Sequence, residues 1–377
     1  MYYFDHSATT KPHKEVLDTF VKVNESFFAN PASLHEMGVD AHTLLSRARK
    51  QVADMLGTED NKVIFTSGGT ESNHFAIHGL AKKVQSRGKH IITSSIEHPS
   101  VIESMKQLEL QGFEVEYLPV DKKGIISIEE LQARLRKDTI LVSIMHINNE
   151  LGSIQPIEEI SRLVHQNSRA IVHVDAVQSF GKYPVSFPLL GADVLTLTGH
   201  KFNGLKGTGI VAWKDHVSFE PTIVGGGQEF GLRSGTVPVA QAVAFAKAMR
   251  LAFENQPIML NKYEQWNTRL RQMMSQLRDV QVLSDFGAAS HILTISVRNL
   301  KGEVLVNALQ SKDIIVSTSS ACSSKQTKIS HVIQAIGVSD DYKKGVIRIS
   351  LGTSNDDQQI DYFIEHFSAI IMRIKGE

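Results

Sequence analysis

The sequence predicts an α/β protein with a large, mostly parallel, doubly wound sheet and a smaller α+β domain at its C-terminal end. Short apolar runs alternate with segments of helical periodicity over the first part of the chain, which is the order expected of successive βαβ units. Beyond Val237 this alternation stops and longer helical segments follow. The chain has 377 residues, more than one hydrophobic core usually serves, and this favours two domains.

The expected strands of the large domain are short and apolar, and they cover residues 63–66, 90–94, 115–118, 140–146, 171–174, 194–197 and 210–213. The segments between them have helical spacing at residues 71–84, 99–110, 128–135 and 156–166. After residue 237 we expect two helical stretches that run to about Leu277, with Pro257 as the break between them.

Strands near residues 291–297 and 346–350, a helix near 303–311 and a final helix from Asp356 would complete the smaller domain. The expected division is an N-terminal arm and large domain over residues 1–255, and a small domain over residues 256–377.

The composition is that of an ordinary soluble protein, with 42% apolar and 21% charged residues. Forty basic residues balance forty acidic ones, so no strong overall field favours nucleic acid or an anionic membrane. No signal peptide is apparent, and the most apolar long stretch, residues 237–253, is too short to span a bilayer. The single cysteine excludes an intrachain disulfide framework and a cysteine-cluster metal site. We therefore expect a cytoplasmic protein.

A lysine at the end of an expected strand is the strongest local signal. Thr198-Gly199-His200-Lys201 directly follows an apolar run, and ligands of open α/β sheets bind at the carboxyl ends of the strands. A lysine there is well placed to form a Schiff base. A lone lysine in a loop would ordinarily be a solvated surface residue, so the chemical interpretation depends on the residues that accompany it.

Other strand ends place suitable groups at the same edge. Asp175 could pair with a pyridinium nitrogen, or it could cap a helix or form a structural ion pair. Ser67-Gly68-Gly69-Thr70-Glu71 links a strand to a helix, where free N–H groups could bind a phosphate, although ordinary capping explains most such turns. His98 could stack on a cofactor ring and transfer protons, or it could be a plain loop histidine. Asn149 follows a further strand.

Two residues of the smaller domain could take part in chemistry or substrate binding. A free cysteine is usually a small buried hydrophobe, but Cys322 is flanked by serine, threonine and lysine, which indicates an exposed loop and a reactive thiol. Arg348 lies in an apolar strand, either as an edge charge facing solvent or as a clamp for a substrate carboxylate. His74 and His78 share a helix face, but no third ligand accompanies them, so we expect no metal site.

In their order and spacing these residues resemble the cysteine desulfurases of iron–sulfur-cluster and tRNA-thiolation pathways, which belong to the class V aminotransferase group of pyridoxal-phosphate (PLP) enzymes. The resemblance runs nearly end to end. It is carried by Asp5-His6-Ser7-Ala8-Thr9-Thr10, Asn30-Pro31-Ala32-Ser33 and residues 67–72, 146–150, 173–175, 199–201, 233–236, 320–322 and 348–352. It implies a fold-type I PLP-dependent transferase that forms a homodimer.

The resemblance also implies a role for individual residues. Lys201 would carry pyridoxal 5'-phosphate, Asp175 would contact its pyridine nitrogen, and His98 would lie over the ring. Cys322 would carry sulfur as a persulfide, and Arg348 would bind the substrate carboxylate.

The remaining implied contacts surround the cofactor and substrate. The phenolic oxygen of the cofactor would be contacted by Asn149 and Gln178. The phosphate cup would contain Gly69, Thr70, Thr198 and His200, together with Thr236 from the other subunit. The substrate site would be lined by Asn149 and Asn30.

The activity implied is conversion of L-cysteine to L-alanine, with sulfur passing to Cys322 and then to a sulfur-acceptor protein. Selenocysteine lyase, another class V aminotransferase and a catalytically silent sulfur-relay scaffold are the alternatives. The residues do not distinguish a cluster-assembly scaffold, a tRNA-thiolation enzyme or a thiamine-pathway protein as the acceptor. Direct binding to nucleic acid or membrane is not expected.

Overall fold

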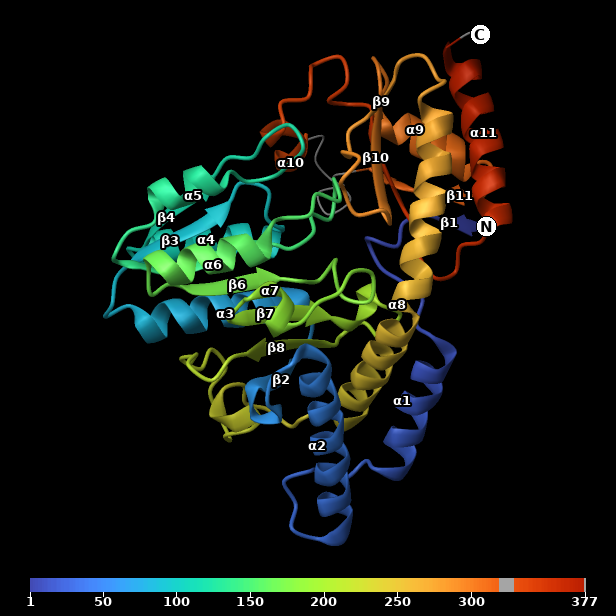
Figure 1. Cartoon of the computed structure of the whole chain (residues 1–377). Helices are drawn as coiled ribbons and strands as arrows, with labels where there is room; N and C mark the ends of the chain where they lie inside the picture. Colours follow the sequence, from blue (N-terminus) through green and yellow to red (C-terminus); the bar gives the residue numbers. More distant parts are fainter. Residues whose placement is uncertain (319–328, 376–377) are drawn as a thin grey trace.

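The computed structural model describes residues 1–318 and 329–375. Its larger part is a seven-stranded sheet in the order β2-β8-β7-β6-β5-β3-β4, with helices on both faces (Figure 1). The strands are β2 (Val63–Thr66), β3 (His90–Ser94), β4 (Glu114–Leu118), β5 (Thr139–Ser143), β6 (Ile171–Asp175), β7 (Val194–Thr198) and β8 (Gly209–Trp213). Strands β3 to β7 pair in parallel, whereas β8 is antiparallel to both β7 and β2. The predicted α/β fold with a mostly parallel sheet is confirmed.

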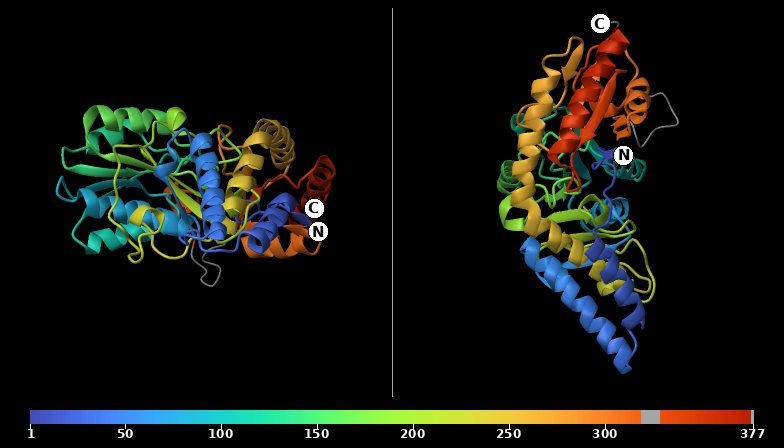
Figure 2. Two further views of the ribbon diagram at one scale, coloured as in Figure 1. Left: turned by 90° about the horizontal axis from the view of Figure 1, so that it is seen from below. Right: turned by 90° about the vertical axis from the view of Figure 1, so that its right-hand side faces the viewer.

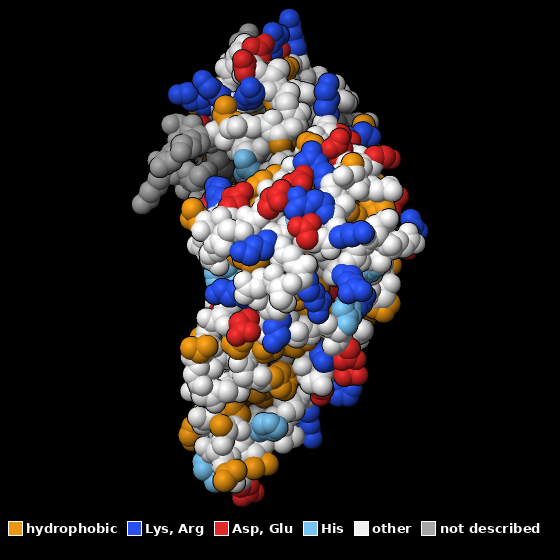
Figure 3. Space-filling model, turned by 90° about the vertical axis from the view of Figure 1, so that its left-hand side faces the viewer, with side chains coloured by type: hydrophobic (Ala, Val, Ile, Leu, Met, Phe, Trp, Pro, Cys, Tyr) orange, Lys and Arg blue, Asp and Glu red, His pale blue; other side chains and the backbone are white. Residues whose placement is uncertain are grey.

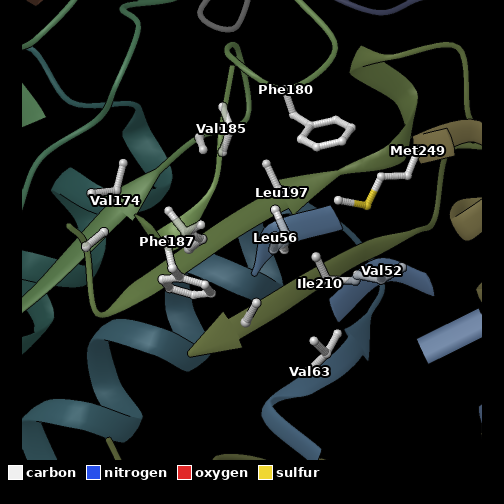
Figure 4. Packing of buried hydrophobic residues seen from close by; sticks show 14 of the residues in the cluster. Val52, Leu56, Val63, Val174, Phe180, Val185, Phe187, Leu197, Ile210 and Met249 are labelled. Atoms are coloured by element: carbon white, nitrogen blue, oxygen red, sulfur yellow. The ribbon is translucent and has the colours of Figure 1, made fainter. Parts of the chain in front are cut away.

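Two apolar clusters cover the two faces of this sheet. One face packs against α3 (Gly69–Val84) and α4 (Pro99–Leu110). The other packs against α5 (Ile128–Arg134), α6 (Ile157–Asn167) and α7 (Phe187–Leu190), and against α2 (Glu36–Leu56). Figure 4 shows how side chains from α2 and from the strands interlock in this second cluster. Because both faces are buried, the strands are apolar runs, and that is why the sequence revealed them.

The predicted strand over residues 140–146 is too long. Strand β5 ends at Ser143, and the following backbone turns across the edge of the sheet. There, the amide of Met145 donates to Glu97 Oε1 at 2.9 Å, and the amide of His146 donates to the carbonyl of Asp175 at 2.9 Å. Residues 144–146 are therefore buried just beyond the end of β5 without belonging to the strand.

The smaller part contains an antiparallel sheet in the order β12-β13-β10-β9. Its strands are β9 (Val280–Val282), β10 (Ile292–Val297), β12 (Ser317–Thr318) and β13 (Val346–Ser350), and its helices are α9 (Gly302–Gln310), α10 (His331–Ala335) and α11 (Asp357–Lys375). The N-terminal strand β1 (Tyr2–Tyr3) pairs in parallel with β11 (Ile314–Ile315), next to this sheet. Phe4 is buried in the same apolar cluster, so the chain begins against the smaller part.

The expected break at Pro257 is wrong. A single helix, α8 (Val239–Met274), has 36 residues and includes Pro257. Proline cannot donate a hydrogen bond to the carbonyl four residues earlier, but packing of the helix against other helices on both sides of Pro257 keeps it continuous. The helix packs against α1 (Lys14–Ser26) and α2 at one end and against α11 at the other (Figure 2).

A domain boundary at residues 255 and 256 stays a prediction. It is supported by the change of apolar cluster along α8, in which Met249 belongs to the large cluster and Met259 to the small one. Within residues 1–318 and 329–375, no helix has both the length and the apolar character needed to cross a membrane.

Candidate active site

Most of the predicted site residues line one cavity of about 410 Å³ at the carboxyl edge of the large sheet. They are Gly69, Thr70, His98, Asn149, Asp175, Gln178, Thr198, His200, Lys201 and Arg348. Asn30 and Thr236 are exposed side chains that do not line this cavity. Asn30 instead accepts a hydrogen bond from the amide of Ala32 at 3.0 Å. Cys322 lies outside the described residues.

A network of hydrogen bonds fixes the carboxylate of Asp175 at the end of β6. Its Oδ2 accepts from Asn73 Nδ2 at 2.7 Å, and its Oδ1 accepts from the amide of Val177 at 3.0 Å. Asn73 also donates to Ser100 Oγ and accepts from Thr196 Oγ1. Asp175 is only 5% exposed, and these donors fix the orientation of its carboxylate at the cavity wall.

The N-terminal arm, residues 4–10, contacts the side chain of Lys201. The Nζ of Lys201 donates to the backbone carbonyls of Ser7 and Ala8, the second at 3.0 Å. The amide of Thr10 in turn donates to the carbonyl of His200 at 2.9 Å. Sequence reasoning included this arm in the resemblance but did not anticipate that its carbonyls contact the lysine.

His98 begins α4 as its N-cap residue. Its Nδ1 accepts from the amide of Ser100 at 3.1 Å, so Nδ1 carries no proton and the neutral ring holds its proton on Nε2. Burial lowers the pKa of His98, and Lys201 lowers it further, while Asp175 acts in the opposite direction. A neutral imidazole therefore lines the cavity near pH 7.

The start of α3 provides backbone donors. Gly68 has φ of 151°, a conformation that side chains rarely allow, and the first amides of the helix have no partner within the helix. A Cβ at Gly69 would lie 3.1 Å from the Val177 side chain, so that position is tight as well. The geometry suits a phosphate at this helix end.

Arg348 is 3% exposed and holds two groups from other parts of the chain. Its Nη1 donates to the carbonyl of Asn149 at 2.8 Å, and its Nη2 donates to Asp5 Oδ1 at 2.9 Å. Within the described residues its Nε has no partner. The guanidinium faces the cavity rather than solvent, and it already binds a carboxylate.

These groups fit pyridoxal 5'-phosphate. A lysine amine, a buried carboxylate and a helix N-terminus are the donors and acceptors that an aldehyde, a ring nitrogen and a phosphate require. In addition, Gln178 Oε1 is buried without a hydrogen-bond partner among the described residues, although Gln178 lines the cavity. An unsatisfied buried oxygen of this kind is expected where a ligand supplies the partner.

The fold and this site match a known family. The chain belongs to the class-V aminotransferase family, whose model matches residues 2–363. That family uses pyridoxal 5'-phosphate, so the expected cofactor is confirmed. Within the family, the chain belongs with the cysteine desulfurases of the IscS/NifS kind.

Three similar proteins support this assignment. A NifS/IcsS protein homolog of Lactobacillus delbrueckii subsp. bulgaricus is 42% identical over 98% of this chain and 97% of its own. The cysteine desulfurase IscS of Pectobacterium carotovorum is 40% identical over 99% of this chain and 93% of its own. A solved NifS-like protein has a TM-score of 0.93 and 38% identity, over 99% of this chain and all of that one.

Proposed function

We propose that this protein converts L-cysteine to L-alanine and delivers the sulfur through Cys322 to an acceptor protein for iron–sulfur cluster assembly or tRNA thiolation. The observation that carries the proposal is the meeting of Lys201, Asp175 and Arg348 at one cavity, although they come from distant parts of the chain. These three groups are those needed to hold the cofactor at both ends of its ring system and to grip an amino-acid carboxylate.

The proposed roles follow from the contacts. When bound, pyridoxal 5'-phosphate would draw electrons from the α-carbon of the amino acid. Asp175, held by Asn73, would keep the pyridine nitrogen protonated, and Gln178 would supply a polar contact to the ring. Lys201 would hold the cofactor and then take the α-proton on Nζ. Arg348 would exchange Asp5 for the substrate carboxylate and so orient the substrate.

Sulfur transfer is assigned to Cys322. Its thiolate would attack the substrate sulfur, so that a sulfur–sulfur bond forms while the carbon–sulfur bond breaks and the carbon keeps the electron pair. Protonation of that carbon then yields alanine. A free thiol has a pKa of about 8.5, so a neighbouring cation such as the substrate ammonium would be needed to favour the thiolate.

The decisive variant is Cys322→Ser. The variant should retain the cofactor and change its absorbance when L-cysteine is added, but it should release no alanine, because the serine hydroxyl cannot accept sulfur. In the wild-type protein, borohydride reduction followed by peptide mapping should place the cofactor on Lys201. Alanine release by Cys322→Ser near the wild-type rate would refute the persulfide route, and a cofactor adduct on another lysine would refute the site.

Assembly as a cytoplasmic homodimer belongs to the same proposal. Exposed apolar side chains gather at the lower end of the molecule around α1 and α2 (Figure 3). They include Leu17, Val21, Phe28, Leu34, Met37 and Val39. We propose that a second copy covers this surface, and we assign Thr236, which is exposed here, to the partner's phosphate cup.

A further inference from the structure

A buried lysine that the mechanism above does not use lies directly behind Lys201. Lys182 is 4% exposed, and its Nζ donates to the backbone carbonyl of Lys201 at 2.6 Å. It lies on the turn that follows β6, only a few residues beyond Asp175 and Gln178. One hydrogen bond therefore ties the segment that carries the ring contacts to the residue that carries the cofactor.

The surroundings of Lys182 are basic. His6 and His291 are buried beside it, and the charge of Lys182 lowers the pKa of both. In residues 1–318 and 329–375, no carboxylate forms an ion pair with Lys182, whose Nζ donates to a backbone carbonyl instead. Burial of an ammonium without a carboxylate raises the free energy of the folded state. A single hydrogen bond to a carbonyl does not by itself explain why a lysine occupies this position.

Burial, followed by the positive charge of Lys201, lowers the pKa of Lys182 to about 7. Because this coupling is mutual, a proton on Lys182 must also make a proton on Lys201 less stable. The charged or titratable groups around this pair are His6, His13, His98, Asp175, His200, Tyr263 and His291, with Arg348 across the cavity.

Four imidazoles of this set do not change charge near pH 7. Burial is the main cause that lowers the pKa of His6 and of His200 to about 4, and it lowers the pKa of His98 and His291 as well. Burial raises the pKa of Tyr263, so its hydroxyl stays neutral. Lys182 is consequently a buried neighbour of Lys201 whose charge changes near neutral pH.

We propose that Lys182 is a positioning residue that fixes the backbone of Lys201 and, through its charge, sets the proton affinity of the Lys201 nitrogen. The proposal rests on the assignment of Lys201 as the cofactor lysine. It gives Lys182 a task in the reaction, because the Lys201 nitrogen must first bind the cofactor and later give up and take back protons.

The test compares two substitutions of Lys182 in the cofactor-loaded protein. Lys182→Met removes the charge but keeps the length of the side chain, whereas Lys182→Arg keeps a charge at every accessible pH. The measurement is the pH midpoint of the absorbance change of the lysine-bound cofactor. We expect the midpoint of Lys182→Met to lie at least about one pH unit above that of Lys182→Arg, a tenfold difference in proton affinity, with the wild type between them.

The exposed Lys83 provides a matched control, because Lys83→Met also removes one lysine charge but lies at the far end of α3. Its midpoint should equal that of the wild type. Equal midpoints for Lys182→Met and Lys182→Arg would overturn the proposal, since a structural role alone does not depend on charge. If Lys182→Arg does not fold, the comparison of Lys182→Met with the wild type decides: a midpoint that is not raised overturns the proposal. Failure of the cofactor assignment itself is detected separately, by a borohydride adduct that does not map to Lys201.

Discussion

The carboxyl group of Glu97 is fully buried beside the cavity, next to His98. Its Oε1 accepts from Ser94 Oγ at 2.6 Å and from the amide of Met145 at 2.9 Å, whereas Oε2 has no partner among the described residues. Burial raises the pKa of Glu97 to about 8, despite the two hydrogen bonds, which act in the opposite direction. The group should therefore be protonated in the folded protein at neutral pH.

Stability should depend on pH as a result. The pKa of this carboxyl is 4.5 in the absence of the fold and about 8 within it. Between these values the folded protein binds a proton that the unfolded chain releases, so the free energy of unfolding falls as the pH rises. Each pH unit in the window corresponds to about 1.4 kcal/mol, and from about pH 5.5 to about pH 7.5 the loss from this one group is about 2.5 kcal/mol.

Glu97→Gln tests this reasoning, because glutamine keeps the shape and the accepting oxygen but cannot ionise. Urea unfolding followed by circular dichroism, at about pH 5.5 and about pH 7.5, gives the stability of the variant relative to the wild type. That difference should grow by about 2.5 kcal/mol in favour of the variant at the higher pH. The exposed Glu103 supplies the control, since Glu103→Gln should show no such growth. The same stability difference at both pH values would refute a protonated Glu97.

Two further predictions concern the substrate and the assembly. Arg348→Lys should raise the KM for L-cysteine by about tenfold or more and leave the cofactor absorbance unchanged, because an ammonium cannot form the paired bonds of a guanidinium; an unchanged KM in an alanine-release assay would contradict this role. Reassembly of Lys201→Ala subunits with Thr236→Glu subunits should restore about a quarter of the wild-type sites, because half the dimers are mixed and each mixed dimer has one intact site. Arg233, three residues before Thr236, is not substituted, because it pairs with Glu71 of its own chain at 2.9 Å. Activity no greater than the sum of the parents, with exchange verified by different tags, would show that each site is built within one chain.

Much of the cavity could be predicted from the sequence because its residues directly follow buried parallel strands. Strand β6 and the strand before Lys201 are apolar runs that end in polar residues, and parallel strands bring their carboxyl ends to one edge. This geometry alone brings Asp175, Thr198 and Lys201 together. The alternation of helices and strands along the sequence and the apolar cores both follow from burial of the two faces of the sheet. That is why the fold class was predictable.

The residues that sequence reasoning missed act through tertiary contacts. Asn73 reaches Asp175 only because it lies one turn beyond Gly69 on the face of α3 that lines the cavity; that spacing was the available signal. Lys182 resembles any loop lysine in the sequence, and its neighbours include His6 of the arm and His291 of the smaller part. Pro257 was misjudged because the helix packing on both sides of it cannot be read from local sequence.

The N-terminal arm connects the two steps that any reaction at this site must coordinate. Phe4 is anchored in the apolar cluster of the smaller part, while Asp5 binds Arg348 and the carbonyls of Ser7 and Ala8 bind Lys201 Nζ. Attachment of the cofactor to that nitrogen and capture of a substrate carboxylate by Arg348 would each replace a contact that the arm now makes. Because Asp5 and Ser7 are two residues apart, release of one contact changes the constraint on the other. Cofactor binding and substrate binding are therefore expected to be coupled through this short segment, in which Asp5 forms a parallel bridge to Ser350 of β13.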